Sequence, residues 1–239
     1  MTHIPSSGGP QAPYGLYISK EHFNNLGGIH KYGYNADIDT AYETIWENGG
    51  AVTFPTTAAT VGVTAGTQAA GNSNCKVRIV GLDGDYNQVD EVLTLDASGD
   101  ATSTNTYLRI NRAFIVGGKN LTADIDLEIG STTVVHLDTD HQQTMQCIYT
   151  VPAGKTAYMV SLQAGSSVKD KNIEMIVKAT TVNGVYRSRD YVAFTDQLSK
   201  TYDIPVKFPE KTDIELQAKS ATSNANVFGS FDIILETNN

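Results

Sequence analysis

The segment TDIELQAKS, residues 212–220, shows the pattern that decides the fold. Its apolar residues Ile214, Leu216 and Ala218 alternate with polar residues at positions 213, 215, 217 and 219. Successive side chains of a β-strand point to opposite faces of a sheet. The segment therefore predicts a strand with one face in the hydrophobic core and the other face in water.

Segments of the same kind follow one another at fairly even spacing from about Val52 to the end of the chain. They are rich in β-branched residues and are separated by clusters of Gly, Asn, Asp and Ser, as strands and turns are. Examples are CKVRIVGL (75–82), QVDEVLTL (88–95), TYLRINRAFIV (106–116), TADIDLEI (122–129), STTVVHL (131–137), KTAYMVSLQA (155–164) and NVFGSFDIILE (226–236). We therefore expect an all-β protein, an antiparallel β-sandwich similar to a jelly roll, with an extended N-terminal arm and at most one short helix.

A proline and two cysteines indicate where parts of this sandwich lie. Pro205 lies inside the strand-like segment YDIPVKF (202–208) and has no N–H to donate to a neighbouring strand, so we expect this strand at the edge of a sheet. Cys75 and Cys147 lie far apart in strand-like segments. This placement favours two isolated buried thiols over a disulfide or a metal site.

The composition disfavours several classes of protein. Of the 239 residues, 40% are hydrophobic and 18% are charged, which is typical of a folded domain rather than a disordered polyanion. The net charge is −9, and a nucleic-acid surface needs clustered cations, so we expect no nucleic-acid partner. The sequence has neither a long apolar run nor an export signal, so we expect no membrane partner.

Residues 1–35 are rich in Gly, Pro, Ser and Asn and have no sustained periodicity, which predicts an extended arm. This arm also carries the aromatic residues Tyr14, Tyr17, Phe23, Tyr32 and Tyr34. An exposed ring forgoes about 1.5–3 kcal/mol that burial would provide, so a free tail with so many rings is unfavourable. We predict that these five residues bind a partner and that a chain without the arm still folds.

Two β-modules follow the arm in this prediction. The first covers residues 36–138, and the second, a β-sandwich, covers residues 139–239, with a polar boundary at HLDTDHQQ (136–143). The sequence leaves open whether the two halves are separate domains or share one sandwich.

One segment, residues 37–50, has a helical pattern. Apolar residues recur there at helical spacing, at Ile38, Ala41, Tyr42, Ile45 and Trp46. Asp37 is a suitable N-cap, and Gly49 and Gly50 can end a helix. The pattern predicts one short helix. The alternative is a loop fixed by Trp46, because the threonines in this segment weaken helix propensity.

Two polar clusters invite comparison with metal sites. Residues 83–87, DGDYN, resemble the start of a calcium loop, but the Gly and Glu that such a loop needs are Gln88 and Thr94 here. Residues 136–141, HLDTDH, offer two histidines, which point to opposite faces of an extended segment at this odd spacing. We expect a hairpin turn at the first cluster, a polar turn at the second, and no metal or other cofactor.

Sequence patterns of common enzymes are missing as well. The chain contains no G-x-S-x-G nucleophile motif, no G-x-x-x-x-G-K-[ST] phosphate loop and no glycine pattern of a dinucleotide site. Carboxylate pairs such as Asp124 and Asp126 occur, but any wet strand face of an acidic protein shows such pairs. We predict a protein without enzymatic activity. A glycan hydrolase is the least favoured alternative.

Three stretches, in this order and spacing, carry a family resemblance. They are YNADIDTAYETIWENGG (34–50), VRIVGLDGDYNQVDEVLTL (77–95) with YLRINRAFIV (107–116), and QTMQCIYTVPAGKTAYMVSL (143–162) with FPEKTDIELQAKS (208–220). Together they resemble a family of virion structural proteins of tailed bacteriophages, particularly marine ones, that are described as structural or capsid-associated. The resemblance covers the chain from about residue 30 to its end. It implies a non-enzymatic component of the virion, assembled in the host cytoplasm.

The resemblance does not place the protein on the head or the tail. Our leading hypothesis is a capsid decoration or cement protein that binds the major capsid protein on the outside of the head. Copies that form a symmetric homo-oligomer, with a trimer as the first guess, would make many weak contacts act together. The alternative is a tail, head-fibre or receptor-binding component that recognises a glycan on the host surface.

Overall fold

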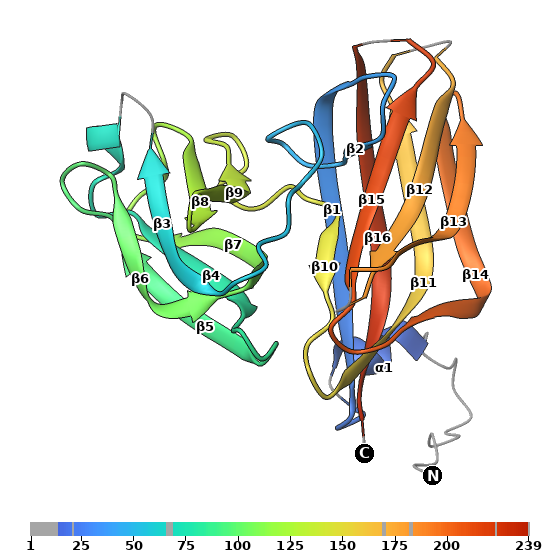
Figure 1. The fold of residues 1–239 in the computed structure, drawn as a ribbon, viewed down its shortest axis with the longest axis horizontal. Coiled ribbons are helices and arrows are strands. Elements are labelled where there is room, and N and C mark those ends of the chain that lie inside the picture. The colour runs from blue at the N-terminus through green and yellow to red at the C-terminus, as the bar shows by residue number, and fades with distance from the viewer. Residues whose placement is uncertain are drawn as a thin grey trace.

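The computed structural model describes residues 14–20, 22–65, 69–168, 171–181, 184–222 and 224–238. Almost all of its regular structure is β, and every strand pairing is antiparallel (Figure 1). Two separate clusters of buried apolar side chains divide the chain into a larger and a smaller β-module. No helix in these ranges is long and apolar enough to cross a membrane.

The larger module consists of two sheets packed on one core. We call them sheet 1 and sheet 2. Sheet 1 has the strand order β1 (Leu26–Ile38), β16 (Ala225–Thr237), β11 (Lys155–Ser166) and β14 (Gln197–Phe208). Sheet 2 has the order β10 (Ile148–Thr150), β15 (Asp213–Ser220), β12 (Ile173–Thr180) and β13 (Tyr186–Phe194), and the short β2 (Glu43–Thr44) pairs with β15.

This strand order is that of a jelly roll. If β2 and β10 are counted as one interrupted strand, the chain order is 1-8-3-6 in sheet 1 and 2-7-4-5 in sheet 2. Consecutive strands thus cross repeatedly between the two sheets, as in the double Greek key of jelly rolls. The predicted fold class, an antiparallel jelly-roll-like sandwich with at most one short helix, is confirmed.

The smaller module is an insertion between β2 and β10. It has a sheet of order β6-β3-β8-β9 and a second sheet of order β5-β4-β7 around its own core. Its elements are β3 (Ala59–Ala65), a 3₁₀ turn η1 (Ala69–Asn72), β4 (Lys76–Leu82), β5 (Gln88–Thr94), β6 (Ala101–Tyr107), β7 (Arg109–Gly117), β8 (Ile125–Ile129) and β9 (Thr132–Leu137). The larger module is therefore built from residues on both sides of the insertion. The expected start of the first module at residue 36 is wrong, because β1 and β2 belong to the larger module and the smaller module begins its strands at β3.

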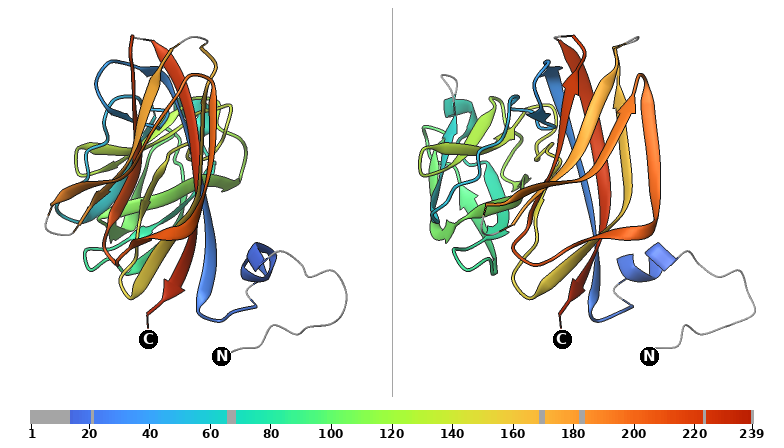
Figure 2. Two further views of the ribbon diagram at one scale, coloured as in Figure 1. Left: turned by 90° about the vertical axis from the view of Figure 1, so that its right-hand side faces the viewer. Right: turned by 45° about the vertical axis from the view of Figure 1, so that its right-hand side comes forward.

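The expected arm does not extend to residue 35. Residues 26–38 form β1, whose partners run from Leu26↔Glu236 to Ile38↔Ala225 along β16. Ile29 and Ile38 contribute to the larger core, because alternate residues of β1 face inward. The helix α1 (Tyr14–Ser19) precedes this strand and buries Ile18 near Gly28, beside the end of the sandwich where β1 begins (Figure 2).

The helix predicted for residues 37–50 is wrong, and the alternative, a loop fixed by Trp46, is what forms. The indole N–H of Trp46 donates to the carbonyl oxygens of Gly49 and Gly50, at 2.8 and 3.0 Å. Thr44 lies in β2, where its backbone pairs with β15 and its hydroxyl donates to Glu215 at 3.1 Å. Strand pairing and side-chain hydrogen bonds therefore outweigh a helical pattern that the threonines already weaken.

The segment 212–220 agrees with the prediction on one face of the strand only. Ile214, Leu216 and Ala218 are fully buried in the larger core, which confirms the inward face. The other face is not in water, since Asp213 and Glu215 are 5% and 1% exposed. The carboxylate of Glu215 accepts hydrogen bonds from Lys178 and Thr44, and burial raises its pKa, although the Lys178 ammonium at 2.6 Å counteracts the rise.

Three local predictions are confirmed. β14 is an edge strand of sheet 1, and its pairing with β11 shifts register between Thr201 and Val206, around Pro205. Cys75 and Cys147 are buried free thiols. The segment 83–87 is the turn of the β4–β5 hairpin, in which Asp83 accepts backbone hydrogen bonds from residues 85 and 87.

A buried ion pair connects the two modules. The guanidinium of Arg109, on β7 of the smaller module, donates two hydrogen bonds of 2.8 and 2.9 Å to the carboxylate of Asp213 on β15. The two side chains are 10% and 6% exposed. Thr150 also donates to this carboxylate at 2.6 Å, and Arg109 donates to the carbonyl oxygen of Pro55 at 2.6 Å. All four groups lie where the modules meet.

Further polar contacts extend this junction along β7. The side chain of Asn111 exchanges two hydrogen bonds with the backbone of Thr150, at 2.8 and 2.9 Å. The ammonium of Lys31 donates to the carbonyl oxygen of Asn111 at 2.6 Å. The backbone N–H of Thr144 donates to Ala113 at 2.9 Å, which attaches the connecting segment to β7. Hydrogen bonds rather than a shared hydrophobic core therefore hold the modules together.

The position of β1 predicts the outcome of two truncations. A chain that starts at Asn24 loses the burial of Ile18, so we expect a loss of about 1.5–3 kcal/mol in the free energy of unfolding and a folded protein. A chain that starts at Asp39 loses β1 and leaves β16 without its partner, so we expect no cooperative unfolding transition. Circular dichroism melts of both chains test this. A shorter chain that melts like the full protein would show that β1 is dispensable.

The ion pair predicts a second result. Arg109→Met leaves the carboxylate of Asp213 buried without its counter-charge, so we expect the free energy of unfolding to fall by about 3–5 kcal/mol in urea titrations. The control is Arg78→Met, which breaks a solvent-exposed pair with Asp90 and should cost no more than about 1 kcal/mol. Equal losses in the two variants would mean that the junction does not depend on this pair.

Candidate functional site

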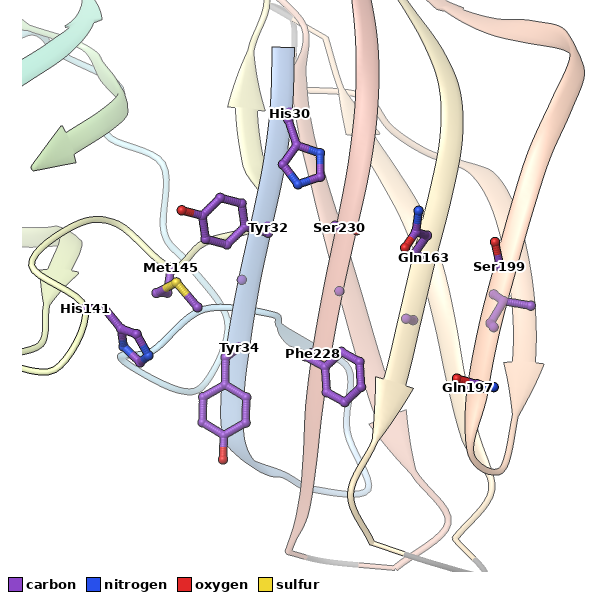
Figure 3. A pocket seen from close by; sticks show the side chains of 14 residues that line it. His30, Tyr32, Tyr34, His141, Met145, Gln163, Gln197, Ser199, Phe228 and Ser230 are labelled. Carbon is purple, nitrogen blue, oxygen red and sulfur yellow. The ribbon is translucent and has the colours of Figure 1, made fainter.

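A groove of about 850 Å³ lies on the face of sheet 1 that is turned away from sheet 2 (Figure 3). Two cross-strand rows form its floor. One row is Tyr34, Phe228, Gly165 and Gln197, and the other is Tyr32, Ser230, Gln163 and Ser199. Each row takes one residue from β1, β16, β11 and β14 in turn, because these strands pair in register over this part of the sheet. Aromatic rings therefore gather at the β1–β16 side, and amides and hydroxyls at the β14 side.

Phe228 is the most apolar feature of this floor. It is 49% exposed, although a phenylalanine in a strand is usually covered. Its ring lies directly over Gly165 on the neighbouring strand, where an added Cβ would come within 2.3 Å of the ring. Glycine at position 165 thus provides the space that the outer end of the ring occupies.

A row of polar side chains continues the floor beyond the groove. The carboxylate of Asp232 contacts His30 Nδ1 at 2.6 Å and accepts a hydrogen bond from Ser161 at 2.5 Å. These residue types occur in serine hydrolases, but there the histidine stands between the serine and the carboxylate. Here the carboxylate is central, so the histidine is not placed to take the proton of the serine. The arrangement orients side chains on a surface and does not activate a nucleophile.

The sequence-predicted aromatic residues lie in two places. Tyr32 and Tyr34 both line the groove (Figure 3). Tyr17 and Phe23 lie at the end of the sandwich near α1, where both rings pack against His22 at 5.5 Å between ring centroids. Tyr14 begins α1, and its side chain is outside the described part of the structure. The five residues therefore do not form one surface.

Sequence reasoning missed the groove residues that come from β16 and β11. On β16, the groove residues Phe228 and Ser230 alternate with the buried Val227 and Phe231. That alternation is visible in the segment NVFGSFDIILE and separates an inner from an outer face. It does not show which strand lies next to which, so the sequence alone could not bring Phe228 beside Tyr34.

The two histidines of the 136–141 cluster point to different partners. His136 Nδ1 lies 2.7 Å from Asp126, and hydrogen bonding to that carboxylate raises the pKa of the imidazole although burial opposes the rise. His141 Nδ1 lies 2.6 Å from Glu47. Across the described ranges no group of three or more His, Cys, Asp or Glu residues is placed to hold a metal ion.

A second hollow, of about 580 Å³, lies between β1 of the larger module and β4 and β7 of the smaller one. We call it the inter-module cleft. It shares His30 and Tyr32 with the groove, so these two residues form the ridge between the two hollows. Lys31 lies on its wall with only 7% of its surface exposed. Burial lowers the pKa of Lys31 to about 8, with smaller contributions from Cys147, which raises it, and Arg112, which lowers it.

The lowered pKa of Lys31 predicts how stability depends on pH. The pKa is about 8 in the folded chain against its ordinary value of 10.5, so the unfolded chain takes up a proton first as the pH falls. The folded state therefore loses up to about 3 kcal/mol of stability between pH 10.5 and pH 8, and this loss persists below pH 8.

Lys31→Met removes this effect. The quantity to compare is the free energy of unfolding of the variant minus that of the natural protein. We expect this difference to be larger at pH 7 than at pH 10.5 by up to about 3 kcal/mol. Urea titrations at the two pH values measure it. If the difference in free energy of unfolding is the same at both pH values, burial of the Lys31 ammonium does not destabilise the folded state.

No protein-family model and no characterised protein matches this sequence. Among solved structures, the chain has a faint likeness to the structure of the infectious bursal disease virus Gx strain, at 10% identity over 88% of this chain and 70% of that chain, with a TM-score of 0.23. The crystal structure of the infectious bursal disease virus VP2 subviral particle gives 10% identity over 88% and 72%, with a TM-score of 0.22. TM-scores this low do not establish a shared fold.

Proposed function

We propose that the protein is a non-enzymatic structural component of a virus particle, a decoration protein that binds the major capsid protein on the outside of a tailed-phage head. It joins the particle in the host cytoplasm and binds as a symmetric homo-oligomer, with a trimer as the first expectation. The observation that carries the proposal is the open face of sheet 1, where Tyr32, Tyr34 and Phe228 line a broad groove.

The fold supports this proposal in a general way. Jelly rolls occur in viral capsid proteins and in lectins, and both classes use the sandwich to present binding surfaces. A fold alone does not define a function, so the chemistry of the surface has to decide. The sequence resemblance to virion structural proteins points to the same class.

The chemistry of the groove is that of a binding surface. Aromatic rings supply large apolar contacts at little cost in side-chain entropy, and the amides of Gln163 and Gln197 offer hydrogen bonds from the floor of the groove. The His30, Asp232 and Ser161 row lacks the order that nucleophilic catalysis requires. A modest contact of this kind becomes effective when several linked copies bind together.

The second candidate is a tail, head-fibre or receptor-binding component that recognises a host-surface glycan. The observation in its favour is the same combination of exposed rings and amides, since sugar rings stack on aromatic faces and their hydroxyls bind amides. The two candidates differ in the number of copies that a particle contains.

Copy number tests the proposal. Purified particles of the phage that encodes this chain would be analysed by quantitative mass spectrometry, with the major capsid protein as the internal standard. We expect on the order of hundreds of copies, as symmetric decoration of a closed shell requires. Tens of copies or fewer would favour the tail or fibre role. Absence from purified particles would overturn both candidates.

Rebinding to particles tests the surface. Particles stripped of this protein would be incubated with the natural chain and with the double variant Tyr34→Ser and Phe228→Ser. We expect the variant to bind at least tenfold more weakly, because both rings leave the groove. The control is Tyr186→Ser, which removes a 48% exposed ring on β13, away from the groove. If the control loses as much binding as the double variant, the groove is not the contact surface.

A further inference from the structure

We infer that the inter-module cleft is a binding site for a compact anion, a carboxylate or a phosphate-sized group, held by Lys31 and Arg112. This site is distinct from the sheet 1 groove and does not depend on a role in a particle. The walls of the cleft carry His30, Lys31, Arg78 and Arg112, and no Asp or Glu is among the residues that line it.

The charge on Lys31 lacks compensation. Its side chain is buried, and its ammonium donates to the carbonyl oxygen of Asn111 at 2.6 Å, which is a neutral acceptor. An ammonium has three N–H donors, and a buried charge is costly unless an opposite charge accompanies it. Among the residues that the structure describes, no carboxylate forms an ion pair with this ammonium. An anion in the cleft would supply the missing opposite charge.

Arg112 provides a second cation at the mouth of the cleft. It follows Asn111 on β7, its guanidinium lies over the ring of Phe114 at 4.4 Å, and it reaches the amide oxygen of Gln143 at 3.4 Å. Neither contact carries a negative charge. A guanidinium held in this way presents planar N–H groups that match the two oxygens of a carboxylate or phosphate. Its charge lies close enough to act on Lys31.

The other two basic side chains already have acidic partners. Arg78 forms an ion pair with Asp90, and His30 lies 2.6 Å from Asp232. The uncompensated charge in the cleft therefore comes from Lys31 and Arg112 alone. This excess of positive charge stands out in a chain whose net charge is −9.

The size and polarity of the cleft fit a small anionic ligand. Its volume of about 580 Å³ lies within the range of roughly 300–1,000 Å³ that small-molecule sites occupy. Thr144 and Gln143 add a hydroxyl and an amide to the wall, and Tyr149 adds an aromatic surface. The same oxyanion chemistry occurs in a free phosphate and in an acidic sugar, so the experiment has to separate these two sources.

Titration with three probes tests the site. The purified full-length protein would be titrated at pH 7 and constant ionic strength with inorganic phosphate, with glucuronate and with glucose, and binding followed by two-dimensional amide NMR. We expect saturable shifts of the amides of Thr144 and Arg112 with at least one of the two anions, and none with glucose, which lacks the carboxylate. Stronger binding of glucuronate identifies an acidic sugar as the ligand class, and stronger binding of phosphate identifies a phosphate group.

Three variants complete the test. Arg112→Gln removes an exposed charge and should leave the fold intact, and we expect it to weaken anion binding at least tenfold. We expect Lys31→Met also to keep the fold and to weaken anion binding at least tenfold. The control Arg187→Gln removes one exposed positive charge on β13 and should keep the affinity within twofold. If neither anion gives saturable shifts, or if Arg112→Gln binds as well as the control does, the cleft is not an anion site.

Discussion

The ion pair between Arg109 and Asp213 is the contact on which the arrangement of the two modules depends. The smaller module enters and leaves the jelly roll at one strand position, and the two hydrophobic cores are separate. In the described part of the chain, no hydrophobic core shared by the two modules fixes its orientation. A bidentate contact is directional, and it is buried among hydrogen bonds from Thr150 and to Pro55. Such a pair defines the geometry of the junction. It adds little net stability, because both charges have to be removed from water.

This geometry determines what surrounds β1. With Arg109 held on Asp213, the carbonyl oxygen of Asn111 on the same strand lies within reach of Lys31 on β1, and Arg112 lies in the wall of the cleft. The amide of Gln143 then donates to the hydroxyl of Tyr32 at 2.6 Å. Tyr32 stands on the ridge between groove and cleft, so the shape of both hollows depends on the same junction.

Local patterns in the sequence predict much of the fold, because they depend on neighbours along the chain. The alternation in 212–220 predicts a strand, and Pro205 predicts an edge. The fate of the polar face of that strand could not be predicted, because Arg109, the partner of Asp213, is 104 residues away in sequence. The same holds for the site. Tyr32 and Tyr34 could be singled out from the cost of exposing their rings, whereas Phe228 joins them in the groove only through the register of β1 with β16.

We propose that the outer face of sheet 1 is the surface by which the protein binds a particle. The most direct measurement is a cryo-electron microscopy reconstruction of the purified particle at a resolution that separates strands. The account predicts density for the jelly roll with Tyr32, Tyr34 and Phe228 in contact with a neighbouring protein. A reconstruction in which this face is open to solvent and the protein is attached through another surface would contradict it.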